Sequence, residues 1–369
     1  MLRTSKTFPL LVLMGLLLAA CAPTPTATPT VVPTATATLA PTATSVPTAT
    51  VTPIPTATLT PTSTATRRPT ITPTPKPVGP IQIEANPDKG FHWPYYLYIP
   101  SSAQGKRILV LPNNTGRRSN DFLVHDASAF SLLRGRIQWA NSLDVTLLVP
   151  IFPRPEIEDG TNGPQYLERA TLEIFSQQTN PTAARPDLQL IAMIDDARER
   201  LATMGIPTDS KILMWGYSAS GMFVNRFAIL HPERVRAVSV GGHGWTIVPV
   251  SEWEGFSLPY PYGIGDLEQL INKPFNLNTF KQVSLYVYMG EEDANGWALP
   301  WYIGTSGRRE FYNMFAPKMG TTSTALIKSA QKIYEAAGCS ATFTIYPRIG
   351  HAISSQMDSD VLNFYRQNK

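Results

Sequence analysis

From residue 81 onward, short apolar runs alternate with longer amphipathic stretches along the chain. The short runs are rich in Val, Ile, Leu and Tyr and end in turn residues, as buried strands of a parallel sheet do. They predict strands at residues 95–99, 107–111, 145–150, 211–215, 235–240, 283–289 and 341–346. The amphipathic stretches predict helices at residues 127–140, 188–204, 219–230, 322–337 and 358–367. This alternation predicts one α/β domain, residues 81–369, with a mostly parallel central sheet, helices on both faces and residues 95–99 in an antiparallel edge.

Residues 246–280 interrupt this alternation. They are rich in Pro, Gly, Trp and Tyr and lie between two predicted strands. Because a long insertion at such a place usually caps or lines a site, we expect a cap or loop beside the functional site. The alternative is a surface loop that takes no part in the functional site.

The first 21 residues have the pattern of an export signal. Arg3 and Lys6 precede an almost wholly apolar run at residues 8–18, which is too short for a comfortable membrane span. The run closes on small residues followed by Cys21, which resembles the bacterial lipoprotein signal. The resemblance implies that Cys21 becomes the mature N-terminus and carries a lipid that holds the protein at the cell surface or the outer face of the membrane. An ordinary cleaved signal with a chance Cys is the alternative.

Residues 22–80 consist almost entirely of Thr, Pro, Ala and Val, with no acidic and no aromatic residue. Proline fixes φ and removes amide donors, so neither helix nor sheet propagates through such a stretch. The composition therefore predicts a disordered linker between the signal and the domain.

The charge of the chain depends on which part is counted. The formal net charge is +4, but five basic residues and no acidic residue lie before residue 81, which leaves −1 for the domain. A nucleic-acid-binding function is therefore disfavoured. The domain holds one cysteine, Cys339, so it folds without an internal disulfide, and we interpret this thiol as structural. No spacing of His, Cys or carboxylates predicts a metal site, and no cofactor is expected.

The strongest chemical signal is the segment Gly216-Tyr217-Ser218-Ala219-Ser220, at the end of a predicted strand and the start of a predicted helix. This is the pattern of a nucleophile elbow, in which small residues two positions on either side let strand and helix approach closely. Gly216 meets the requirement, and Ser220 stands where a second Gly is usual. If Ser220 were the nucleophile, the large Met222 would occupy a flanking position. Ser218 is therefore the predicted nucleophile.

A serine hydroxyl needs a base and an orienting carboxylate. His351 follows the last predicted strand, and Asp293 follows the strand before it. The chain order Ser218, Asp293, His351 is the order that an α/β hydrolase requires. His351 would take and return the serine proton, while Asp293 fixes its tautomer. Glu291 and Glu292 are rival acids.

Stabilising a tetrahedral oxyanion needs two preorganised amide donors. The amide of Ala219 is one, because it lies at the start of a helix. The second is expected after the first central strand, where Asn113 or Asn114 offers a backbone amide and a side-chain amide. A turn-forming Asn pair without a catalytic part is the alternative.

The sequence positions of two further histidines suggest a role for each. His231 ends a predicted helix, where an imidazole can bind free carbonyls. His243 and Trp245 follow a predicted strand at the edge where ligands bind in open α/β sheets, so they either line the substrate cleft or pack within a loop.

Residues 90–369 resemble the α/β hydrolases and, within them, the exported polyhydroxybutyrate depolymerase and feruloyl-esterase-like group. The resemblance rests on Gly216 to Gly221, on residues 227–235, on Gly290 to Asp293 and on Gly350-His351. It implies hydrolysis of esters through an acyl-enzyme, although the usual His-Gly residues of the oxyanion loop are absent.

We therefore expect a surface-anchored carboxylic ester hydrolase acting on ester, polyester or polysaccharide-linked substrates. A peptidase of the prolyl-oligopeptidase type is the first alternative, although its large extra propeller domain is missing. The second is a non-catalytic protein that binds carbohydrate or polymer through tryptophans on the same scaffold. Those tryptophans are Trp245, Trp253, Trp297 and Trp301.

Overall fold

The computed structural model of this protein describes residues 78–102, 106–113, 116–156, 167, 169–172, 182–294 and 306–369. The chain divides into two units, residues 1–69 and residues 70–369, and every described residue belongs to the second. The predicted export signal, Cys21 and the linker as far as residue 77 lie outside the described residues. The first strand begins at Val78, and therefore takes in the last three residues of the predicted linker, because it pairs with the next strand.

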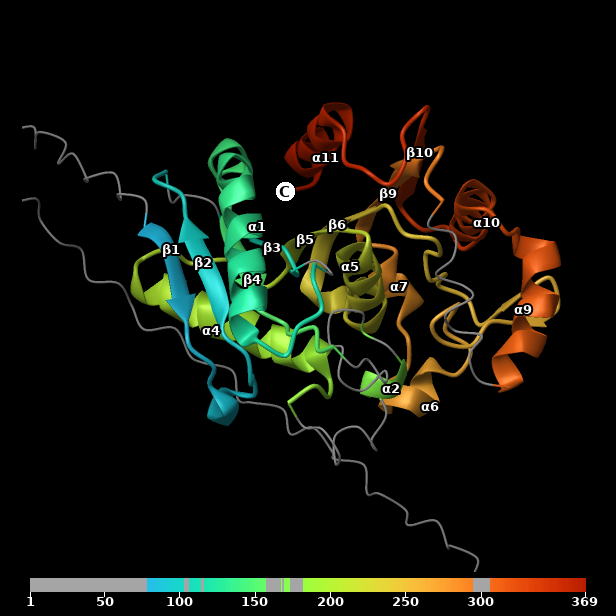
Figure 1. Cartoon of the computed structure of the whole chain (residues 1–369), viewed down its shortest axis with the longest axis horizontal. Helices are drawn as coiled ribbons and strands as arrows, with labels where there is room; N and C mark the ends of the chain where they lie inside the picture. The colour runs from blue at the N-terminus through green and yellow to red at the C-terminus, as the bar shows by residue number, and fades with distance from the viewer. Residues whose placement is uncertain are drawn as a thin grey trace, which may run out of the picture. The chain divides into compact units, whose positions relative to one another are not determined.

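The described residues form one sheet of eight strands in the order β1-β2-β4-β3-β5-β6-β9-β10 (Figure 1). The strands are β1 (Val78–Ile83), β2 (Tyr95–Ile99), β3 (Ile108–Val110), β4 (Thr146–Pro150), β5 (Ile212–Tyr217), β6 (Val235–Gly241), β9 (Ser284–Gly290) and β10 (Ala341–Tyr346). Pairing is antiparallel between β1 and β2 and between β2 and β4, and parallel at every other step. The predicted α/β class with an antiparallel edge is confirmed.

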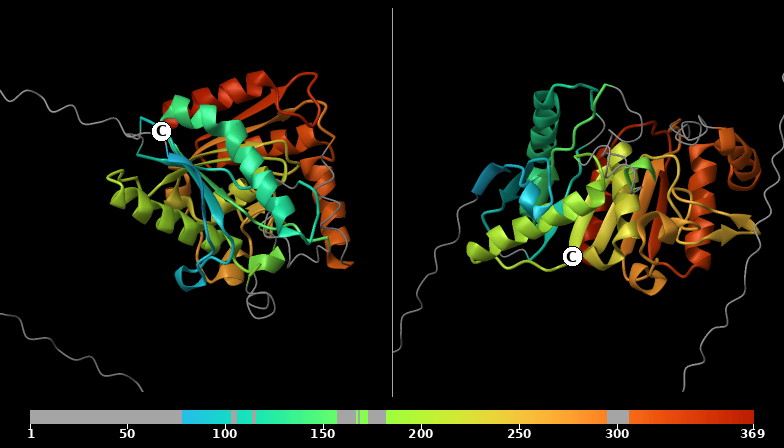
Figure 2. Two further views of the ribbon diagram at one scale, coloured as in Figure 1. Left: turned by 60° about the vertical axis from the view of Figure 1, so that its left-hand side comes forward. Right: turned by 90° about the horizontal axis from the view of Figure 1, so that it is seen from below.

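Helices cover both faces of this sheet (Figure 2). On β5, Ile212 and Met214 point into an apolar layer shared with α4, α5 and α10, whereas Leu213 and Trp215 point into a layer shared with α1 and α11. Because successive side chains of a strand point to opposite faces, the sheet contributes to two separate apolar layers. The helices are α1 (Phe122–Leu143), α2 (Arg169–Leu172), α4 (Pro186–Thr203), α5 (Ala219–Leu230), α6 (Leu267–Ile271), α7 (Leu277–Phe280), α9 (Ser306–Met319), α10 (Ser323–Ala336) and α11 (Ser355–Asn368). None of the helices in the described part is long and apolar enough to cross a membrane.

Residues 246–280 contain a short hairpin of β7 (Glu252–Trp253) and β8 (Phe256–Ser257), followed by α6 and α7. Much of the insertion is continuous with the core, because Ile247, Val248 and Leu258 are fully or almost fully buried in the same apolar layer as α5. The Tyr334 hydroxyl on α10 donates to the carbonyl of Ile247 at 2.8 Å. The insertion is thus built into the domain on the side of α5 and α10.

Candidate active site

The turn between β5 and α5 holds Ser218 in a rare backbone conformation. Its φ is +61° and its ψ −123°, outside the region that L-residues favour. Such strain persists only where the surroundings enforce it, and it is characteristic of nucleophile elbows. A Cβ atom on Gly216 would lie 2.1 Å from the carbonyl oxygen of Ser220, so only glycine fits there. The local geometry is that of the predicted elbow.

The second close approach at this turn falls one residue later than the motif suggests. A Cβ atom on Gly221 would lie 2.6 Å from the carbonyl oxygen of Gly241 on β6, so this is the position that excludes a side chain. Ser220 is tolerated because its buried hydroxyl turns back onto Tyr217, donating to the carbonyl at 2.9 Å and accepting from the amide at 3.0 Å. The Ser220 hydroxyl is therefore engaged in the turn. The sequence signal that could have identified Gly221 is its place on the first turn of a helix packed against the adjacent strand.

The three predicted triad residues meet at one edge of the sheet. Strands β5, β6, β9 and β10 run parallel, so the segments that follow β5, β9 and β10 emerge together. His351 Nε2 lies 3.1 Å from Ser218 Oγ, and His351 Nδ1 lies 2.9 Å from Asp293 Oδ2. The Asp293 carboxylate is fully buried, whereas the imidazole is 34% exposed. With its proton on Nδ1, His351 donates to Asp293 and can accept the serine proton on Nε2.

The rival acids lie apart from the imidazole. Glu291 and Glu292 are exposed, and a Glu291 carboxylate oxygen accepts from the backbone amide of Arg348 at 3.4 Å. The backbone amide of Glu292 instead supports the loop that carries His351, because it donates to the carbonyl of Ile349 at 2.9 Å. Of the three acids, Asp293 is the one that the fold brings to His351.

The predicted oxyanion residues have different surroundings. Ala219 is the first residue of α5, where a backbone amide has no partner within the helix. Asn113 is almost wholly buried, and its side chain is occupied: Nδ2 donates to the carbonyl of Phe152 at 2.7 Å, and Oδ1 accepts from the Phe152 amide at 3.0 Å. Asn114 lies outside the described residues.

Asn113 follows β3, the strand that pairs with β5. The parallel pairing of β3 with β5 ends at Val110 and Met214, three residues before Asn113 and three before Tyr217. The Asn113 side chain continues the β3–β4 pairing past Pro112, which has no amide hydrogen to donate. The start of the loop after β3 is thereby fixed to the segment that follows β4.

His243 is 5% exposed, and its Nε2 lies 3.4 Å from the Thr246 hydroxyl. Burial lowers the pKa of His243 to about 3, with the positive charge of Arg226 acting in the same direction and Asp293 opposing it. The imidazole is therefore neutral at neutral pH.

Trp245 is 9% exposed, donates from Nε1 to the carbonyl of Tyr262 at 2.8 Å, and packs edge-on against Phe315 at 4.9 Å between ring centroids. These contacts are those of packing between the insertion and α9. Of the other tryptophans considered above, Trp253 is half-buried, whereas Trp297 and Trp301 lie outside the described residues.

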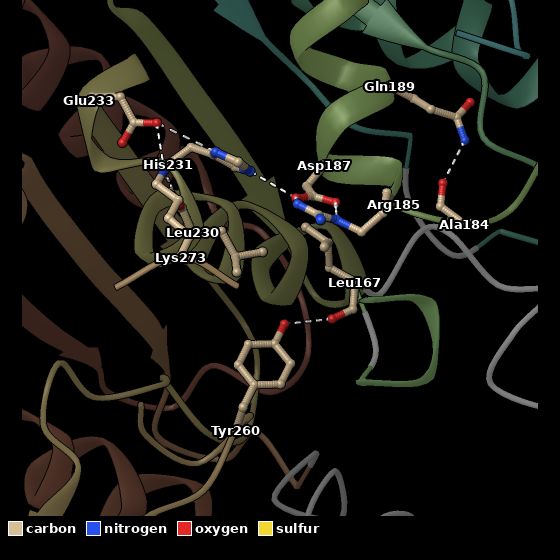
Figure 3. A network of polar contacts seen from close by, with 10 residues as sticks. All are labelled: Leu167, Ala184, Arg185, Asp187, Gln189, Leu230, His231, Glu233, Tyr260 and Lys273. Atoms are coloured by element: carbon tan, nitrogen blue, oxygen red, sulfur yellow. Dashed lines mark hydrogen bonds and ion pairs between the residues drawn. The ribbon is translucent and has the colours of Figure 1, made fainter. Parts of the chain in front are cut away.

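A buried ionic network holds the far end of α5 (Figure 3). Contrary to the expectation from sequence, His231 does not bind the helix carbonyls: its Nε2 lies 2.8 Å from Asp187 Oδ2, and Lys273 Nζ donates to the carbonyl of Leu230 at 3.1 Å. Arg185 donates twice to the same Asp187, at 3.0 and 2.7 Å. Burial alone would raise the pKa of Asp187, but the hydrogen bonds from His231 and Arg185 outweigh it and lower this pKa to about 2.

Within the described ranges, no three His, Cys, Asp or Glu side chains are grouped closely enough to hold a metal ion. Cys339 is a free, half-buried thiol, and burial raises its pKa to about 11. A thiol in this environment stays protonated at neutral pH, which agrees with a structural role.

No protein-family model matches the chain, and no curated protein sequence matches it. Solved structures do. Poly(aspartic acid) hydrolase-1 from Sphingomonas sp. KT-1 has a TM-score of 0.51 at 16% identity, over 77% of this chain and 97% of that one. The poly(3-hydroxybutyrate) depolymerase LpqC from Bordetella parapertussis has a TM-score of 0.47 at 16% identity, over 78% and 87%. An S-formylglutathione hydrolase from Agrobacterium tumefaciens has 0.44 at 12% identity, over 79% and 96%. With the sheet order and the elbow described above, the first of these likenesses identifies the fold as that of an α/β hydrolase.

Proposed function

We propose that this protein is a serine hydrolase that cleaves carboxylic esters through an acyl-enzyme at Ser218. One observation carries the proposal: a single imidazole lies within hydrogen-bonding distance of both a strained serine hydroxyl and a fully buried carboxylate. A hydrogen-bonded chain of nucleophile, base and orienting acid is what activates a serine at neutral pH.

In the first half-reaction, Ser218 Oγ attacks the ester carbonyl carbon while its proton passes to His351 Nε2. The resulting imidazolium is stabilised by Asp293, which accepts from Nδ1. The oxyanion of the tetrahedral intermediate accepts a hydrogen bond from the Ala219 amide and from a second amide in the loop after β3. The intermediate collapses, the C–O bond to the alcohol breaks, and the alcohol leaves with the proton from His351.

In the second half-reaction, a water molecule gives a proton to His351 Nε2 and attacks the acyl carbon. The new tetrahedral intermediate expels Ser218 Oγ, which recovers its proton from the imidazolium. The products are the carboxylic acid and free enzyme, and the cycle uses no oxidant and no cofactor.

An ester series tests this proposal. Turnover of p-nitrophenyl esters of increasing chain length, feruloyl esters and polyester films should be measured for wild type, Ser218→Ala and Asp293→Asn. We expect Ser218→Ala to lose at least about a thousandfold in kcat. Glu292→Gln is the matched control for Asp293→Asn, because it neutralises an exposed acid in the same loop, and it should keep turnover within about twofold.

The same assay separates the alternatives. Peptide and poly(aspartic acid) substrates contain amide bonds, and faster turnover of these than of every ester would favour a peptidase. Binding of the polyester film without hydrolysis of any substrate would favour a non-catalytic protein. Turnover by Ser218→Ala equal to that of wild type would contradict the proposed nucleophile.

We also infer that the domain is displayed outside the cell on a lipid-anchored stalk. The support is the signal-like segment that ends at Cys21 and the Thr- and Pro-rich residues 22–77. In a bacterial host, the full chain should sediment with membranes and Cys21→Ser should not. Wild-type protein found wholly in the soluble fraction would contradict the anchor.

A further inference from the structure

The loop that carries His351 is exposed, and it lies between β10 and α11. His351, Ala352 and Ile353 are all exposed residues, so burial alone does not fix the loop that carries the imidazole. Before the histidine, the carbonyl of Ile349 accepts from the Glu292 amide at 2.9 Å. After it, the carbonyl of Ala352 accepts from the hydroxyl of Tyr217 at 3.0 Å. The loop of the base is therefore held on both sides, by an amide just after β9 and by a hydroxyl at the end of β5.

Tyr217 is the residue directly before the nucleophile, and it is 4% exposed. Its ring lies 5.2 Å from the imidazole of His351, measured between centroids, at an interplanar angle of 40°. The ring reaches the histidine loop across the end of β6. One side chain therefore links the elbow directly to the loop of the base.

Two glycines make room for this ring. A Cβ atom on Gly242 would lie 2.4 Å from Cζ of Tyr217, and one on Gly241 would lie 2.6 Å from its Cδ2. Gly242 also has a φ of +56°, which glycine adopts without strain. On another side the ring contacts Tyr288, at 6.2 Å between centroids. The backbone and aromatic neighbours leave the ring little freedom to rotate, so its hydroxyl is held at the carbonyl of Ala352.

We propose that Tyr217 is a positioning residue that sets the separation between Ser218 and His351 through the bond from its hydroxyl to Ala352. This inference rests on the proposed function, because it assigns a role within the same triad. Ser218 and His351 belong to segments that follow different strands, so their separation depends on how the two segments are coupled. The hydrogen bond from the Tyr217 hydroxyl to the Ala352 carbonyl couples these segments, because Tyr217 is adjacent to Ser218 and Ala352 is adjacent to His351. Burial and the nearby Asp293 raise the pKa of Tyr217, which keeps the hydroxyl protonated and able to donate.

Tyr217→Phe tests the inference, because it keeps the ring and removes only the hydroxyl. We expect the rate constant for labelling Ser218 with a fluorophosphonate, and kcat for an ester, to fall about tenfold, since small misplacements of reacting groups are costly. KM should stay within about twofold, because the bond acts on the base and not on the bound substrate. Rates are normalised to the fraction of folded protein.

Tyr98→Phe is the matched control. The Tyr98 hydroxyl on β2 donates to Asn141 Oδ1 at 3.0 Å, on the antiparallel side of the sheet. Its loss should leave labelling within about twofold of wild type. Equal losses in the two variants would show that removing any tyrosine hydroxyl slows the enzyme, and would overturn the specific role of Tyr217.

A second measurement does not depend on turnover. The proton between His351 Nδ1 and Asp293 should give a low-field ¹H NMR signal, and Tyr217→Phe should broaden or shift it, whereas Tyr98→Phe should not. An unchanged signal together with a wild-type labelling rate in Tyr217→Phe would overturn the inference. Failure of the wild type to label would contradict the proposed function instead, and the NMR comparison would still decide whether Tyr217 positions the imidazole.

Discussion

Replacing Asn113 by alanine tests how the loop after β3 is held beside the elbow. The side chain makes two hydrogen bonds, of 2.7 and 3.0 Å, to the backbone carbonyl and amide of Phe152. Phe152 is fully buried, so neither group gains water when the asparagine is removed. An unpaired buried backbone group costs about 1–3 kcal/mol, so two of them should lower the free energy of unfolding by about 2–6 kcal/mol.

Urea unfolding followed by circular dichroism measures this loss, which is a large share of the roughly 5–15 kcal/mol that stabilises a typical domain. Asn141→Ala is the matched control, because this exposed asparagine accepts one hydrogen bond and should cost about 1 kcal/mol or less. We also expect Asn113→Ala to lower kcat for esters, because Asn113 lies in the loop after β3, where the second oxyanion amide is proposed. A loss of stability no larger than that of the control would refute the bidentate anchor.

Three other outcomes follow from the geometry of the turn and of the buried network. Gly216→Ala should abolish ester turnover or soluble expression, because its Cβ would lie 2.1 Å from the Ser220 carbonyl oxygen, and wild-type turnover would contradict this. Asp187→Ala should lower the free energy of unfolding by about 3–5 kcal/mol in a urea titration, because it strips His231 and Arg185 of a buried partner, and a loss under about 1 kcal/mol would be incompatible with that network. The pKa of Asp187 is about 2 in the folded protein, below its ordinary value of 3.8. The contribution of this carboxylate to the free energy of unfolding is therefore complete above about pH 5 and is lost as pH falls toward 2. Asp187→Asn should therefore flatten the acid side of the curve of stability against pH, and an unchanged acid side would speak against the depressed pKa.

Much of the sheet was predictable because its signals are local. Residues 95–99 and 341–346 coincide with β2 and β10, since a short apolar run between turn residues marks a buried strand. The amphipathic pattern predicts a helix start at residue 127, five residues after α1 begins at Phe122. The signal that fixes it is Asp121, whose carboxylate accepts from the Leu123 amide and caps the helix.

The members of the proposed triad were predictable for a different reason: each follows a strand, and parallel strands bring such segments to one edge. What could not be predicted depends on contacts between distant segments. The bond of Asn113 to Phe152 spans 39 residues, and that of Tyr217 to Ala352 spans 135. Gly221 is needed because of β6, which it meets only in the folded chain. No pattern within one segment contains these relations.

The placement of His243 and Trp245 shows the same limit. Their position after β6 allows either lining of a cleft or packing within a loop, and Trp245 packs against Phe315 of α9, a helix that the sequence pattern did not predict. What a loop side chain packs against depends on the element that covers it, and here that element is far along the chain.

The central claim is that Ser218 is the nucleophile, and one measurement addresses it directly. The purified chain is treated with a fluorophosphonate, its intact mass is determined, and the modified peptide is sequenced by mass spectrometry. We predict one adduct per chain, located on Ser218, and none in Ser218→Ala or in heat-denatured wild type. Labelling that persists in Ser218→Ala, or an adduct on Ser220, would contradict the account.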